Sequence, residues 1–162
     1  MSVLSASVLA GCGGGSAGPT AGTPTGSVAA THACGHPGNS HRVDLVVHPA
    51  KATTIKRCVG FSGANISALS VVRDSGVEVQ TQSYGSLGLA PCQVAGVPAH
   101  YTKCLAAGKP YWALFVSRDG GAWTEPPVGL SHITLNPGDT LGLAYDSPQG
   151  TPAPPSGSPP RP

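Results

Sequence analysis

Short apolar runs punctuated by turn residues dominate the middle of the chain, a pattern that favours β-strands. Val77–Gln82 alternates apolar and polar residues as a half-buried strand does. Val43–His48 is largely apolar with β-branched residues and stops before Pro49. The run Tyr111–Val116 gives the strongest strand prediction, because aromatic and β-branched residues are enriched in strands.

Weaker runs predict further strands, and two turns connect some of them. The remaining candidate strands are Ile55–Phe61, Cys92–Gly96, Ala122–Thr124, Ser131–Leu135 and Thr140–Tyr145. Arg118–Gly121 predicts a hairpin turn with glycine available for positive φ. Asn136–Asp139 carries Pro then Gly at its centre, which is the signature of a type II turn.

One helix is predicted, over residues 66–75. Ile66, Leu69 and Val72 recur every third position, Asn65 is a plausible N-cap, and Gly76 stands where a helix commonly ends. One helix with six to eight short strands predicts an α+β fold in which the helix lies on a single mixed sheet.

Composition divides the chain into a folded domain and two tails. Residues 41–146 hold every aromatic and every charged residue except Arg161. Residues 12–40 are mostly Gly, Thr, Pro, Ser and Ala and contain no Lys, Arg, Asp or Glu, which predicts a flexible linker. Residues 147–162 contain seven prolines and predict a disordered tail.

Low charge excludes some classes of function. Nine Lys and Arg against seven Asp and Glu give a formal charge of +2, too little for the basic surface of a nucleic-acid binder. No apolar run is long enough to span a bilayer. Gly60–Ala64 only nearly matches a nucleophile elbow, and the few acids form no obvious pair, so we expect no enzyme and no catalytic residue.

The N-terminus resembles a bacterial lipoprotein signal. A small apolar stretch over residues 1–11 ends in Leu9-Ala10-Gly11 before Cys12. The resemblance implies cleavage before Cys12, lipidation of its thiol and anchoring on the extracytoplasmic face of the cell membrane. No Lys or Arg precedes the apolar stretch, which departs from the usual signal, and the alternative is a chance cysteine in an Ala/Gly-rich terminus.

The other four cysteines predict two disulfides. An even number in an exported chain allows three connectivities, of which Cys92–Cys104 with Cys34–Cys58 is the natural one. His32, Cys34, His36 and His41 crowd one stretch and could be read as zinc or copper ligands. Because that stretch is linker and Cys34 keeps the disulfide count even, no metal site is expected.

The order of motifs over roughly residues 42–146 resembles the C-terminal domain type of transcobalamin and intrinsic factor, which also occurs in bacterial surface proteins. The motifs are Gly76-Val77, the turn Tyr84–Leu89, the cysteines Cys92 and Cys104, Tyr111-Trp112, and Pro137–Asp139 before a last strand ending in Tyr145. The cysteine spacing is similar to that of the actinobacterial branch. The resemblance implies a β-grasp-like sheet with one crossing helix.

In the vitamin carriers such a domain covers one face of cobalamin, so the resemblance implies a cobalamin or related corrinoid as ligand and no covalent cofactor. By position, Leu87, Gly88, Leu89 and Trp112 would lie near the corrin, although a Trp on such a strand is more often a core residue. The chain lacks the helical barrel that holds the other face. We therefore expect a helical-barrel partner and a vitamin-uptake transporter, or alternatively a surface or cell-wall interaction module without a small ligand.

Overall fold

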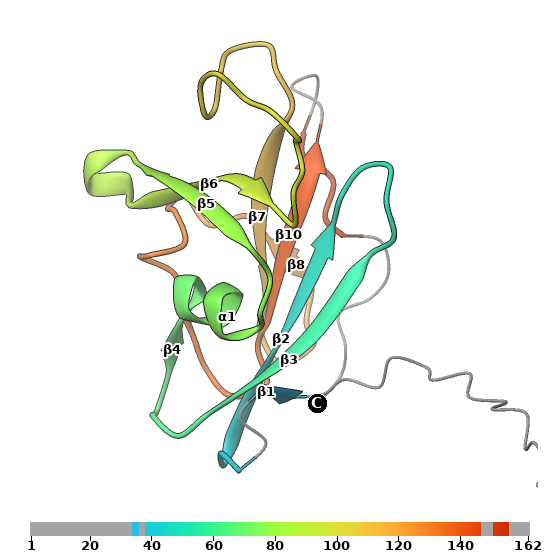
Figure 1. Ribbon diagram of the computed structural model, residues 1–162. Coiled ribbons are helices and arrows are strands. Elements are labelled where there is room, and N and C mark those ends of the chain that lie inside the picture. Colours follow the sequence, from blue (N-terminus) through green and yellow to red (C-terminus); the bar gives the residue numbers. More distant parts are fainter. Residues whose placement is uncertain (1–33, 36–37, 147–150, 156–162) are drawn as a thin grey trace, which may run out of the picture.

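The computed structural model describes residues 34–35, 38–146 and 151–155 and has an α+β fold. Its main element is a mixed sheet of six strands in the order β1-β3-β2-β10-β7-β8. Helix α1 (Ala68–Asp74) lies against one face of this sheet (Figure 1). The predicted β-grasp-like arrangement of one mixed sheet and one crossing helix is confirmed.

The strands differ greatly in length. Those of the main sheet are β1 (Cys34–Gly35), β2 (His41–His48), β3 (Ile55–Phe61), β7 (Tyr111–Ser117), β8 (Trp123–Thr124) and β10 (Thr140–Asp146). Two small sheets pair β4 (Ile66–Ser67) with β9 (Thr134–Leu135), and β5 (Val79–Ser83) with β6 (Leu89–Val94) across the 3₁₀ turn η1 (Gly85–Leu87). The strands exceed the predicted number because β1 and β4, of two residues each, are too short to leave a hydrophobic pattern.

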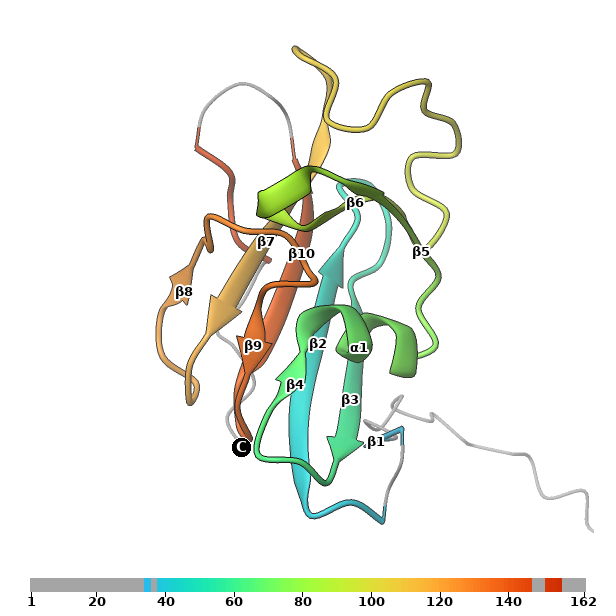
Figure 2. The same ribbon diagram turned by 90° about the vertical axis from the view of Figure 1, so that its left-hand side faces the viewer.

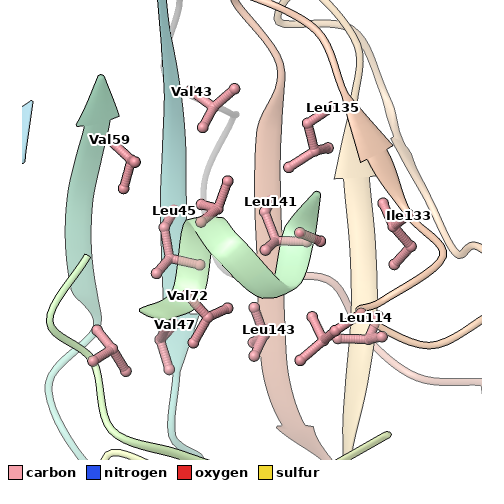
Figure 3. Packing of buried hydrophobic residues seen from close by; sticks show 14 of the residues in the cluster. Val43, Leu45, Val47, Val59, Val72, Leu114, Ile133, Leu135, Leu141 and Leu143 are labelled. Carbon is pink, nitrogen blue, oxygen red and sulfur yellow. The ribbon is translucent and has the colours of Figure 1, made fainter. Parts of the chain in front are cut away.

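The core forms where β2 and β10 run parallel at the centre of the sheet. Leu45 pairs with Leu141 and Val47 with Leu143, and all four side chains are fully buried. Alternate residues of a strand face the same side of a sheet, so these side chains point together toward the helix. Figure 3 shows them meeting Val72 of α1, and this packing fixes the helix on the sheet.

The helix begins two residues later than predicted, at Ala68. Ser67, not Asn65, is the N-cap, and its hydroxyl accepts a hydrogen bond from the Ser70 amide at 3.1 Å. Ile66 and Ser67 instead pair with β9, which keeps the chain extended up to the cap. Gly76 has the positive φ of 73° expected just beyond a helix end. No helix among the described residues is long and apolar enough to be a membrane span.

The opposite face of the sheet carries a second, smaller cluster. Ala113, Phe115 and Ala144 form it, and Trp123 packs against them. Pro155 is buried and approaches Gly142, and the amide of Ala153 donates to the Asp146 carboxylate at 2.6 Å. Residues 151–155 therefore lie against the sheet, unlike the disordered tail predicted for this stretch. The rest of that tail, the predicted signal at 1–11 with Cys12, and most of the predicted linker lie outside the described residues.

Both predicted disulfides are confirmed. Cys34–Cys58 joins β1 to β3 in parallel register, so Cys34 belongs to the sheet and not to the preceding linker. Cys92–Cys104 ties β6 to the long loop that leads into β7. The second bridge therefore fixes the loop beside the end of the sheet where β7 begins.

A buried carboxylate joins the turns at the opposite end of the sheet, where β7 ends and β10 begins. Asp139, 2% exposed, accepts hydrogen bonds from the Arg118 guanidinium and from the Asn136 amide. Arg118 also donates to the Thr134 carbonyl at 2.9 Å. Gly138 has φ of 87°, as the predicted type II turn requires. The turn after β7 and the turn before β10 are thereby held together.

Replacing Asp139 by Ala should lower the free energy of unfolding by about 2–3 kcal/mol, because the Arg118 guanidinium and the Asn136 main-chain amide lose the buried carboxylate that joins the two turns. Urea unfolding measures this. Asp74→Ala, at the exposed end of the helix, is the matched control and should change stability by less than about 0.5 kcal/mol. Equal effects of the two substitutions would contradict the structural role of Asp139.

Candidate functional site

Three of the four residues predicted to lie near a ligand line one hollow. Leu87, Gly88 and Trp112 border an open cavity of about 310 Å³. Segment 125–129 forms another wall of it, and residues 111–114 of β7 form its floor. Figure 2 shows β5 and β6 crossing in front of the upper part of the sheet, with β8 at the outer edge. Leu89 is the next residue along but does not line the hollow.

Exposed apolar side chains gather at this end of the molecule. Leu87, Tyr101 and Leu105 are 55%, 39% and 42% exposed, and they are the large hydrophobic residues most open to solvent among those the structure describes. Leu87 and Leu105 line the hollow, while Tyr101 and Leu105 line a neighbouring one of about 360 Å³. We call these three side chains the apolar rim. Such a gathering is typical of a binding surface, because singly scattered exposed residues are the norm elsewhere.

Trp112 supports the hollow from below. The side chain is only 3% exposed, its indole N–H donates to the Val97 carbonyl at 2.8 Å, and its ring is tilted against Tyr145 at a centroid distance of 5.3 Å. These contacts are those of a core residue, the second of the two readings left open by the sequence. Because the side chain is almost fully buried, a ligand in the hollow would contact little of the indole.

The main chain of the glycine-rich turn is already hydrogen-bonded within the protein. The Gly88 amide donates to the Gly85 carbonyl at 3.0 Å, and its carbonyl accepts from the Tyr84 amide at 2.9 Å. The Leu87 carbonyl accepts from Gly129, and the Leu89 amide donates to the Ser131 hydroxyl. The turn therefore offers a ligand the Leu87 side chain and not the free amides that a close backbone approach at Gly88 would have supplied.

Gly88 is required for a different reason, namely the packing of the turn against the chain that precedes β9. It has φ of 87°, and a Cβ atom there would stand 2.6 Å from the Ser131 Oγ. On the other side, a Cβ atom at Gly129 would stand 2.4 Å from the Leu89 carbonyl oxygen. Two glycines thus allow the two segments to touch, and this contact sets the position of Leu87.

Few polar side chains are available in the hollow. The Tyr84 hydroxyl is engaged, because it donates to the Cys104 carbonyl at 2.7 Å and so fastens the loop bearing Leu105. Burial, and secondarily the carboxylates of Glu125 and Asp146, raises the pKa of Tyr111 above its ordinary value. The phenol is therefore protonated near neutral pH and can donate a hydrogen bond. Glu125 is exposed on the wall of the hollow and can accept one.

Sequence reasoning missed most of the rim. Tyr101 and Leu105 lie in the loop between β6 and β7, where the hydrophobic residues follow no regular spacing that would have singled them out. A signal was present, since apolar residues stand among Lys, Gly and Thr in a loop closed by a disulfide. Of the other candidates, His41 lies tilted against the Phe61 ring at a centroid distance of 5.7 Å, and His32 and His36 lie outside the described residues. No metal-ligand cluster occurs within the described part of the chain.

Comparison with known proteins assigns no family to the chain. No protein-family model matches it, and no curated protein matches it. One solved structure with a similar chain course is described as a "putative metal binding protein" from Ruminococcus gnavus ATCC 29149. It is 13% identical, with a TM-score of 0.47, and the match covers 66% of this chain and 97% of that one. A functional assignment therefore has to rest on the hollow and its rim.

Replacing Gly88 by Ala should lower the free energy of unfolding by about 2–4 kcal/mol, because it adds a steric overlap to an unfavourable φ. Gly85→Ala is the matched control: it has φ of 60° but open space around it, so about 1–2 kcal/mol is expected. Chemical denaturation of both variants measures the difference. If Gly88→Ala proves no worse than Gly85→Ala, the close contact with Ser131 is wrong.

Proposed function

We propose that this protein is an extracytoplasmic, lipid-anchored binding module that covers one face of a cobamide, while a helical partner covers the other. The observation that carries the proposal is the apolar rim, of which Leu87 and Leu105 line the hollow and Tyr101 lines its neighbour. A corrin is a broad, partly apolar disc, and binding sites for such ligands are mostly apolar with few polar groups.

The dimensions favour covering over enclosure. A hollow of about 310 Å³ is at the small end of ligand pockets, so a corrin would rest on the rim with an edge substituent inserted. The Tyr111 hydroxyl and the Glu125 carboxylate are then the groups available to the peripheral amides. Two disulfides support a location outside the reducing cytosol, where such bonds persist. Lipidation of Cys12 and the vitamin-uptake transporter belong to the same proposal.

An interaction module without a small ligand is the second candidate. Its specific support is the scarcity of polar side chains in the hollow, where the Tyr84 hydroxyl and the main chain of the turn are already engaged. A protein partner requires fewer directed polar contacts per unit of area than a small polar ligand does. The two candidates are separated by a titration.

Titration of the isotope-labelled protein with cyanocobalamin and with cobinamide should shift the amides of Leu87 and Leu105 in two-dimensional NMR spectra. Weak, millimolar binding is expected from half of a site. Leu87→Ser should weaken it about 10-fold, because a rim side chain of this size buries enough apolar surface to matter.

Ala64→Ser is the control, since Ala64 is exposed beyond the far end of β3 and should leave binding unchanged. Absence of shifts at millimolar ligand would contradict the cobamide proposal and favour the second candidate. Shifts that persist undiminished in Leu87→Ser would contradict the assigned face.

A further inference from the structure

The outer edge of β7 is only partly covered by its neighbour. Strand β8 pairs with β7 at Val116 and Ser117 alone, so residues 111–114, which pair with β10 on one side, have no strand on the other side in the described part of the chain. The cause lies two positions beyond β8, where Pro126 and Pro127 follow. Proline has no N–H to donate to a ladder, so β8 cannot continue along β7.

The direction of the free main-chain groups follows from one hydrogen bond. The Thr124 hydroxyl donates to the Val116 carbonyl at 3.0 Å, so the main chain of Val116 faces β8 and not β10. Alternate residues of a strand direct their main-chain groups to the same side. The N–H and C=O groups of Leu114 and Trp112 therefore point to the open edge as well. None of their N–H and C=O groups bonds to another described residue outside the strand ladders.

These groups lie in the hollow and not on a convex surface. Trp112, Ala113 and Leu114 form its floor, with Leu87 on one wall and Pro127 on the other. Main-chain groups shielded from bulk water are nearly always paired in proteins. The floor therefore presents unused donors and acceptors at the spacing of a β-ladder, between two apolar walls.

The edge at the other side of the sheet is built differently. There the open part of β3 carries the exposed residues Lys56 and Arg57, and charged side chains are a common protection against unwanted pairing. Residues 111–114 are Tyr-Trp-Ala-Leu and carry no such protection. The contrast indicates that pairing is tolerated at β7 and discouraged at β3.

The charge of the hollow indicates which kind of peptide it would bind. Glu125 is the charged residue that lines the hollow, it is exposed, and it makes no ion pair with a described residue. A carboxylate beside an apolar groove complements a Lys or Arg on the occupant.

We propose that the open edge of β7 binds an extended, apolar peptide segment that carries a basic residue, as an additional strand from a protein partner. Strand addition draws affinity from main-chain hydrogen bonds and specificity from alternate side chains and, here, from Glu125. The proposal goes beyond the cobamide function and does not depend on it, because it uses the main chain of Trp112 and Leu114.

The probe is an acetylated, amidated octapeptide in which valine alternates with threonine around one lysine. In the free protein, the Trp112 and Leu114 amides should exchange hydrogen faster than those of Ala113 and Phe115, which face β10. Saturation with the peptide should slow exchange at Trp112 and Leu114 selectively. An analogue N-methylated at its internal amides keeps the side chains but should not bind, because it cannot donate to the edge.

Two variants test the edge and the charge. Pro126→Thr with Pro127→Val restores the amides that β8 lacks, so the extended β8 should cover the edge and weaken peptide binding at least about 10-fold without loss of thermal stability. Glu125→Lys should reverse the preference, so that a glutamate-containing peptide binds better than the lysine peptide.

Equal binding of the N-methylated analogue, or slow exchange of Trp112 and Leu114 in the free protein, would overturn the proposal. So would unchanged binding by the folded double variant. A failure of cobalamin to bind would contradict the cobamide proposal but not the strand-addition proposal. Peptide binding, in turn, would neither support nor contradict the cobamide proposal.

Discussion

The parallel pairing of β2 with β10 is the constraint on which the structure depends. These strands come from the two ends of the domain, and their side chains Leu45, Val47, Leu141 and Leu143 make the centre of the core. Every other strand of the main sheet is added outward from this pair, with β3 on one side and β7 on the other. Because the centre is closed in this way, any binding surface built on the sheet has to form at an edge or an end.

The two edges of the main sheet differ in how far they are covered and in which residues limit further pairing. On the β3 side a disulfide pins the short strand β1, and Lys56 and Arg57 follow along the uncovered part. On the β7 side two prolines stop β8 after two residues. The same prolines then form a wall of the hollow, while the turn that bears Leu87 closes the opposite side. The hollow is thus a consequence of where β8 ends, and its apolar character follows from the residues that end it.

Local pattern was enough to predict much of this fold. Strand β3 has the predicted limits, both disulfides pair as expected, and Gly138 occupies the positive-φ position of its turn. Tertiary pairing decided what the pattern could not. Ser67 and not Asn65 caps the helix because β4 pairs with β9 and keeps the chain extended up to Ser67. Two-residue strands such as β1 form only because a neighbouring strand pairs with them. The period of two requires that either Tyr111 or Trp112 face inward, but which one depends on the register with β10.

Candidate site residues were predicted only where glycine or an aromatic residue drew attention to a turn or strand. The rim shows why this was incomplete: Leu105 matters through its position on a loop fixed by Cys92–Cys104 and by the bond from Tyr84, and position cannot be read from a sequence without a period. That fixation has an energetic consequence, because a face held before binding loses little conformational entropy when it is covered. A rigid apolar rim suits the flat side of a disc, and a rigid strand edge suits an extended chain. Both would occupy the hollow beside Leu87, so one occupant must exclude the other wherever they overlap.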